Sequence, residues 1–156
     1  TPPVIPPPPP PPPPASQTGL PPGADSYDSP SQKVGDPFDG GIWHNARNGS
    51  AAASRTLAQT VCVAGVHLPS AGTDVDTTGS TIEIVLTGPS GERFVALQVL
   101  DAAINRDFSP GGNARVATPP QSRQFAPFPT RRVELTMRGH GWFMASGLRF
   151  VVVPCP

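Results

Sequence analysis

The sequence contains little charge, few aromatic side chains and no long apolar run. Only 14% of its 156 residues are charged and 6% are aromatic, and eleven basic residues balance eleven acidic ones. A net charge of zero argues against a nucleic-acid-binding protein, because such proteins gain much of their affinity by neutralising phosphates. No apolar run reaches the roughly 18 residues that a membrane-spanning helix needs, so the sequence predicts no membrane span.

Cysteine is equally scarce, and the chain holds only Cys62 and Cys155. Each lies in or beside an apolar, strand-like run, and no second Cys or His stands at metal-ligand spacing. We therefore expect a disulfide, which would stabilise the fold by about 4–5 kcal/mol through the long loop that it closes. The alternative is two buried free thiols in a reducing cell. The signs of secretion described below favour the bridge.

Residue types that serve catalysis are present, but their spacing predicts no active site. The histidines, His44, His67 and His140, belong to no recognisable nucleophile–base pattern. The stretch from Gly88 to Gly91 contains a serine, yet it lacks the spacing of a nucleophile elbow and is typical of a hairpin turn. The carboxylates are scattered among turn residues. The sequence therefore predicts a protein without enzymatic activity and without an obligatory cofactor.

Proline, in contrast, is abundant at the N-terminus, where fifteen of the 24 prolines precede residue 38. Nine of them run without interruption from Pro6 to Pro14. Fixed φ angles and missing N–H groups restrict such a run to a polyproline II rod, about 28 Å long at ~3.1 Å per residue. We divide the chain into a polyproline II arm at 1–14, an extended linker at 15–40 and a β-sandwich domain at 41–156.

Several features of the chain indicate secretion. It begins at Thr1 without Met or an apolar signal segment, so we expect that a signal peptide has been removed. Asn48 opens an N-glycosylation sequon. Candidates for O-glycosylation among the prolines are Thr1, Ser16 and Thr18. These features predict an extracellular glycoprotein; the sequence leaves open whether the chain is one unit of a longer protein.

From about residue 41 the sequence is typical of an all-β domain. Alternation of apolar and polar residues predicts strands at 60–68, 81–87, 93–100 and 131–138. The residues expected on the apolar faces of the last three are Ile82, Ile84, Leu86, Val95, Leu97, Val99, Val133, Leu135 and Met137. Several short strands with turns between them predict a single β-sandwich or jelly roll.

Three other segments are expected to complete this domain. A nearly continuous apolar run at 148–153 is typical of a central strand. The proline-rich segment 110–129 is expected to be mainly loop, and 101–107 to form a short helix.

Two groups of residues are candidates for ligand binding. Asp74 and Asp76 open a stretch that resembles the start of a calcium loop, but Val85 stands where the bidentate Glu would follow. A structural Ca²⁺ site therefore competes with a plain turn. Aromatic faces next to Arg or Asp can stack on sugar rings, and the candidates are Trp43, Trp142 and Tyr27. The alternative for both tryptophans is a place in the core.

Two resemblances add to these predictions. Residues 1–30 resemble the proline-rich stretches of extracellular matrix glycoproteins of the extensin and pherophorin kind, although the extensin Ser-Pro repeats are missing; the resemblance implies hydroxylated, glycan-bearing prolines. The domain is similar to discoidin-type, galactose-binding-like jelly rolls in the strands Arg-Arg-Val-Glu-Leu at 131–135 and Gly-Leu-Arg-Phe-Val-Val-Val at 147–153. That similarity implies a ligand site carried by loops and, in some members, structural Ca²⁺.

These observations support two hypotheses of function. In the first, the chain is a structural subunit of an extracellular glycosylated fibre or matrix, and the arm of one copy binds the next copy head to tail. An acidic part at 1–86, with seven acids and three bases, and a basic part at 87–156, with four acids and eight bases, favour such contacts. The residues of this assembly arm would be Val4, Ile5, Pro6, Pro10 and Pro14. In the alternative hypothesis, the chain is a secreted carbohydrate-binding or adhesive module with the arm as a spacer.

Overall fold

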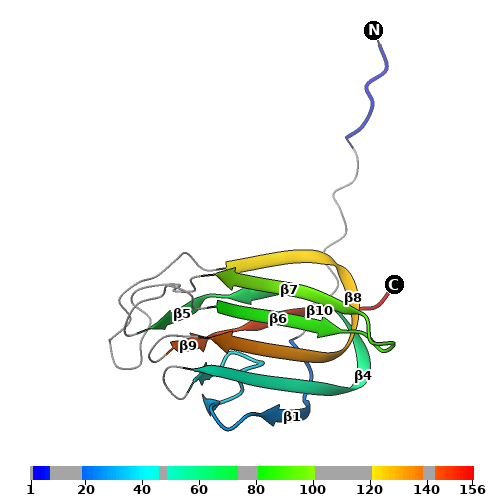
Figure 1. The fold of residues 1–156 in the computed structure, drawn as a ribbon. Helices are drawn as coiled ribbons and strands as arrows, with labels where there is room; N and C mark the ends of the chain where they lie inside the picture. Colours follow the sequence, from blue (N-terminus) through cyan, green and yellow to red (C-terminus); the bar gives the residue numbers. More distant parts are fainter. Residues whose placement is uncertain (1, 8–18, 46–48, 74–80, 101–120, 139–142) are drawn as a thin grey trace.

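The computed structural model describes residues 2–7, 19–45, 49–73, 81–100, 121–138 and 143–156, and the regular elements among them are β-strands (Figure 1). Within these ranges the strands are β1 Gly23–Tyr27, β2 Gln32–Val34, β3 Ile42–His44, β4 Ser50–Leu68, β5 Ser70–Thr73, β6 Thr81–Thr87, β7 Arg93–Leu100, β8 Gln121–Arg138, β9 Phe143–Ser146 and β10 Arg149–Val153. The predicted all-β class is confirmed.

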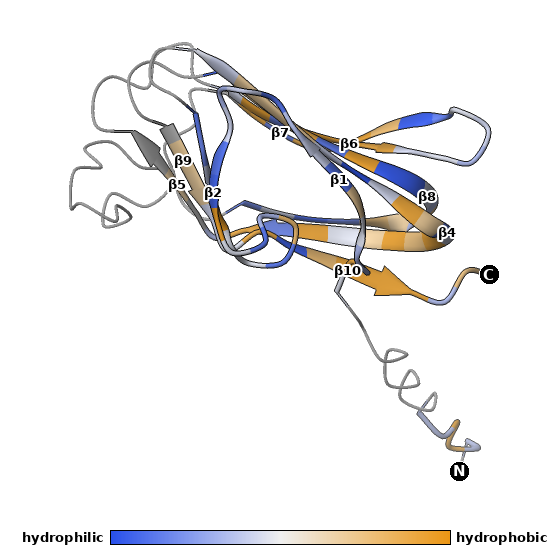
Figure 2. Ribbon diagram, turned by 90° about the horizontal axis from the view of Figure 1, so that it is seen from below, coloured by the Kyte–Doolittle hydropathy of each residue, from blue (hydrophilic) through white to orange (hydrophobic). Residues whose placement is uncertain are grey.

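The strands form two antiparallel sheets, packed as a sandwich. In the larger sheet the order is β1–β4–β8–β6–β7, and β10 also pairs with β4. In the smaller sheet the order is β2–β3–β9–β5. Figure 2 views the molecule from below, with β5, β9 and β2 at the side away from the C-terminus. The predicted single β-sandwich is therefore the observed architecture.

Two long strands, β4 and β8, bend together. Their pairing is interrupted between Thr56 and Val61, where the register shifts. The first part of β4 pairs with β1, and the part after the shift pairs with β10. Figure 1 shows both ribbons turning over on the side of the molecule where the C-terminus lies. This bend lets one pair of strands cover the core from more than one side.

The strand β8 begins earlier than the sequence predicts. Loop was expected at 110–129, but 121–129 belong to β8 although they include Pro127 and Pro129. Pro129 lies opposite Cys62, close to the register shift, and proline is tolerated where the ladder of backbone hydrogen bonds is already interrupted. The rest of that segment and the helix predicted at 101–107 lie outside the described residues.

Part of the predicted linker belongs to the sandwich. Strand β1 pairs with β4, strand β2 pairs with β3, and the side chains of Leu20 and Phe38 are buried. The structure therefore corrects the linker interpretation for residues 20–38. Alternation of apolar and polar residues could not reveal β1, because one of its inward side chains is the carboxylate of Asp25. The buried Arg55 neutralises this carboxylate. Residues 2–7 lie outside any strand, and the polyproline II form of the arm stays a prediction.

The apolar faces predicted from alternation are confirmed with one exception. The buried residues are Ile82, Ile84, Leu86, Leu97, Val99, Val133, Leu135 and Met137. Val95 is instead 43% exposed. The register of β6 with β7 shifts between Ile84 and Val85, so Ala96 is buried while Val95 turns outward.

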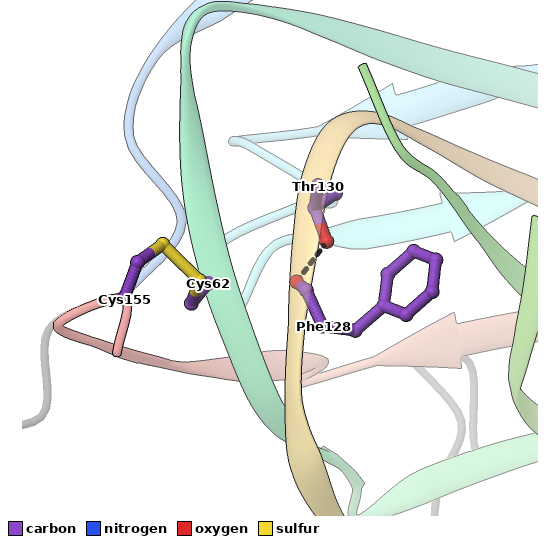
Figure 3. The surroundings of a disulfide bond; sticks show 4 residues. All are labelled: Cys62, Phe128, Thr130 and Cys155. Atoms are coloured by element: carbon purple, nitrogen blue, oxygen red, sulfur yellow. Dashed lines mark hydrogen bonds between the residues drawn. A yellow bond between two sulfur atoms is a disulfide. The ribbon is translucent and has the colours of Figure 1, made fainter. Parts of the chain in front are cut away.

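The strand β10 lies at an edge and not at the centre of its sheet. It pairs only with β4 among the described strands, which corrects the predicted central position. Its apolar character, visible in Figure 2, comes partly from Phe150 and Val152, which are buried. Just after this strand, Cys155 forms a disulfide with Cys62 of β4, with Cα atoms 5.1 Å apart (Figure 3). The predicted bridge is confirmed, and it ties the end of the chain to the longest strand.

Candidate functional site

The solvent-facing side of the larger sheet carries rows of polar side chains. Residues that alternate with the core residues of β4, β8 and β6 point outward, and the register aligns them across the sheet. The rows are Ser50, Arg138 and Thr81; then Ala52, Thr136, Glu83 and Gln98; then Ser26, Ser54 and Glu134. Neighbouring rows are about 7 Å apart, since two residues of an antiparallel strand span that distance.

Short side chains on β4 leave two hollows in this face, which together we call the outer trough. One hollow, of about 290 Å³, lies over β1, β4 and β8. The other, of about 350 Å³, lies over β4, β8, β6 and β7. Ala52 and Thr136 line both hollows, so the two adjoin. The other outward side chains of the lining are Ser26, Asp28, Ser54, Arg132, Glu134, Ser50, Thr81, Glu83, Gln98 and Arg138.

The carboxylates of the outer trough have polar partners. Glu134 lies 3.2 Å from Nε of Arg132, and Nε2 of Gln98 donates a hydrogen bond of 3.1 Å to Glu83. Asp28 accepts hydrogen bonds from a backbone N–H of β4 and from a serine hydroxyl. These contacts fix the side chains around the hollows without filling them.

The outer trough suits a ligand that carries many hydroxyl groups. Its lining combines hydroxyl, amide, carboxylate and guanidinium groups, which together offer both donors and acceptors. The small side chain of Ala52, in the middle, allows a ligand to approach the sheet closely. Such a surface can hold a polar, extended molecule laid across the strands.

A second cluster joins β7 to the first part of β8. The ring centroid of Phe94 lies 4.8 Å from that of Phe125 and 5.3 Å from that of Phe128. The guanidinium of Arg123 covers Phe94 at 5.2 Å and donates a hydrogen bond of 2.7 Å to the carbonyl of Val95. The three rings are partly buried and pack against the core. We interpret this cluster as a closure of the β7 edge and not as a ligand platform.

A buried arginine joins the N-terminal part of the sandwich to β4. Arg55 is 4% exposed and donates hydrogen bonds to Asp25 and Asp36, and its guanidinium carbon lies 4.7 Å from the ring centre of Phe38. The hydrogen bond to Asp25 raises the pKa of Arg55 above its ordinary value, so the guanidinium stays charged. Burial, together with the charges of Asp25 and Asp36, raises the pKa of Tyr27 to about 12.

The structure places some of the predicted ligand-binding residues and leaves others outside its description. Trp43 is 3% exposed and its Nε1 donates to Ser31, so it belongs to the core and the stacking prediction for it is wrong. Tyr27 is half-buried, with Nζ of Lys33 4.7 Å from its ring centre, and its stacking role stays a prediction. Outside the described residues lie Thr1, Pro10, Pro14, Ser16, Thr18, Asn48, Asp74, Asp76 and Trp142.

In the described part of the chain, no three His, Cys, Asp or Glu side chains gather closely enough to hold a metal ion. The same residues contain no helix with the length and apolar character needed to cross a bilayer.

The residues of the outer trough were missed at the level of the sequence. A signal does exist in β4, where small outward residues at Ser50, Ala52 and Ser54 alternate with buried Ala51 and Ala53. Such alternation of small residues predicts a shallow place on a sheet, but the partner strands that complete the hollows cannot be chosen from it.

The fold of this chain resembles that of known carbohydrate-binding modules. No protein-family model matches the sequence, and no curated protein matches it. Among solved structures, the family 32 carbohydrate-binding module of C. perfringens NanJ, in complex with galactose, has a TM-score of 0.53 at 12% identity, covering 87% of this chain and 99% of that one. The CBM32 of AlyQ, in complex with 4,5-unsaturated mannuronic acid, has a TM-score of 0.48 at 13% identity, covering 85% and 97%. The similarity to the C. perfringens module supports the predicted galactose-binding-like sandwich as a fold.

Proposed function

We propose that this chain is a secreted, non-catalytic carbohydrate-binding or adhesive module, and that the outer trough is its glycan-binding surface. The observation that carries this proposal is the pair of adjoining hollows around Ala52 and Thr136, lined mainly by polar side chains. Sugar hydroxyls both donate and accept hydrogen bonds, so they match such a lining better than an apolar ligand does.

Two further observations support the class of function. The C. perfringens module of the same fold was solved with galactose, although at 12% identity the likeness concerns the fold. The disulfide between Cys62 and Cys155 is typical of proteins from oxidising compartments, which agrees with secretion. In this proposal the proline-rich arm is a spacer, and the glycosylation candidates at Asn48, Thr1, Ser16 and Thr18 keep their predicted roles.

The fibre hypothesis receives no support from the described residues or from the solved structures of similar fold. Those structures are carbohydrate-binding modules, which favours the alternative hypothesis. Val4 and Ile5 are 91% and 87% exposed in the single chain. Head-to-tail assembly through the arm stays a prediction.

A glycan array tests the proposal with a matched pair of variants on β4. Ala52→Gln places a long neutral side chain into both hollows, whereas Thr56→Gln makes a similar change on the same face of β4, outside the two linings. We expect the wild-type chain and Thr56→Gln to bind the same glycans, and Ala52→Gln to lose that binding. Binding of every variant to the same extent would exclude the outer trough, and binding of no glycan by the wild type would exclude the function.

A further inference from the structure

We infer that the outer trough binds acidic glycans, and that the row of Ser50, Arg138 and Thr81 holds their anionic group, a carboxylate or a sulfate ester. This inference rests on the proposed function, because it names the class of glycan that the same surface binds.

The guanidinium of Arg138 is a charged group of the outer trough that can bind a ligand. Arg138 is exposed and lines the larger hollow at the end of β8. In the part of the chain that the structure describes, it belongs to none of the ion pairs, whereas Arg132 is paired with Glu134. One positive charge is thus available to a ligand at this end of the outer trough.

The neighbours of Arg138 in its row add hydroxyl groups and no carboxylate. The register places Ser50 of β4 on one side of Arg138 and Thr81 of β6 on the other. A guanidinium presents paired N–H groups that match two oxygens of a carboxylate or a sulfate, and the hydroxyls can donate to the ligand as well. The row therefore provides the donors that an anionic group needs.

The position of Glu83 fixes the direction in which an acidic glycan lies. Glu83 is in the next row, about 7 Å away along the strands, and it accepts a hydrogen bond from Gln98. A second anionic group at that row would be repelled, so the part of the glycan over Ala52 and Thr136 is neutral. The ligand class is a chain whose acidic residue sits at Arg138 and whose hydroxyl-bearing neighbours extend toward β1.

Calorimetric titration with matched oligosaccharides tests this inference. The probes are a neutral oligosaccharide, its uronate counterpart oxidised at the primary hydroxyl, and its sulfated counterpart. We expect the wild type to bind the anionic probes more tightly, and Arg138→Gln to lose about 10- to 100-fold in affinity for them, because a charge-assisted hydrogen bond is removed. Affinity for the neutral probe should be unchanged, Arg138→Lys should retain part of the preference, and Glu83→Gln should increase it.

The control is Arg93→Gln, which removes an exposed arginine of β7 outside both hollows. It should keep the anionic preference, and unfolding midpoints of Arg138→Gln and Arg93→Gln equal to that of the wild type would show that the fold is intact. Preference for the uronate or for the sulfate probe identifies which group the row binds.

Equal affinity of the wild type for neutral and anionic probes would overturn the inference and leave the proposed function standing, whereas binding of no probe would overturn both. An unchanged preference in Arg138→Gln would overturn the assignment of the row.

Discussion

Arg55 and Asp25 lie directly opposite each other on β4 and β1 and are joined by two hydrogen bonds, from Nε to Oδ1 at 2.7 Å and from Nη2 to Oδ2 at 2.8 Å. The side chain of Arg55 is 5% exposed and that of Asp25 is 24% exposed. The same guanidinium also contacts Asp36, the carbonyl of Pro21 and the ring of Phe38, so one side chain holds several parts of the N-terminal segment.

Replacing Arg55 by Met should therefore destabilise the protein by about 3 kcal/mol, because Asp25 and Asp36 would lose their common partner in a partly buried place. Urea unfolding of the two proteins measures the difference. The matched control is Arg149→Met, which breaks the exposed ion pair with Asp39 and should cost at most about 1 kcal/mol. Equal losses in the two variants would contradict the role of Arg55 as an anchor.

Ionisation of Tyr27 should destabilise the fold at alkaline pH. Its pKa is raised from 10.0 to about 12, chiefly by burial, so the native state keeps the phenol proton at a pH where the unfolded state has lost it. The contribution of Tyr27 to the free energy of unfolding is fully present below pH 10 and is lost as the pH rises through about 12.

The chain has one tyrosine, so an ultraviolet absorbance titration of the native protein reports on Tyr27 alone. Tyr27→Phe should remove this component of the alkaline loss in stability. A native titration midpoint near 10 would show that the phenol is not shielded as described.

Reduction of the disulfide should lower the free energy of unfolding by about 4–5 kcal/mol, because Cys62 and Cys155 are 93 residues apart and the bridge restricts a long segment of the unfolded chain. Urea unfolding with and without a reductant measures this. The double variant Cys62→Ala and Cys155→Ala should be insensitive to the reductant, since the chain has no other cysteine. A reductant effect that persists in the double variant would have another origin.

Arg123→Gln should loosen the edge of β7. Its guanidinium donates to the carbonyls of Val95 and Ala96, and Val95 is exposed at this edge. Unprotected edge strands pair with other chains, so we expect faster amide hydrogen exchange in β7 and a greater tendency to aggregate. Arg131→Gln, a change at an exposed arginine of β8, is the control and should leave both properties unaltered.

Much of the sheet that holds the outer trough follows from local sequence patterns. The strands β6 and β7, the later part of β8, and β10 show period-two alternation or an apolar run, and the turn between β6 and β7 carries Gly91 at a φ of 90°. The pairing of Cys62 with Cys155 follows from their being the two cysteines of the chain. These features depend on neighbouring residues or on simple counting, which a sequence shows directly.

Other elements depend on contacts between distant segments. β1 has the sequence Gly-Ala-Asp-Ser-Tyr and forms a strand because Arg55, 30 residues away, neutralises its Asp25. Val95 faces outward because a register shift opposite Ile84 and Val85 interrupts the alternation that would bury it. Trp43 is buried because β3, held in its sheet between β2 and β9, packs this side chain into the core cluster that also contains residues of the larger sheet.

The sequence by itself determined the class of the protein: an all-β, disulfide-closed domain behind a proline-rich segment, because proline, cysteine and alternating apolar residues act locally. Only the tertiary structure decided where a ligand can bind. The outer trough takes Ser50, Arg138 and Thr81 from three strands far apart in the chain, and their meeting in one row depends on the register of β4 with β8 and of β8 with β6. A shift of one residue in either pairing would turn these side chains into the core, so their proximity is a property of the folded sheet.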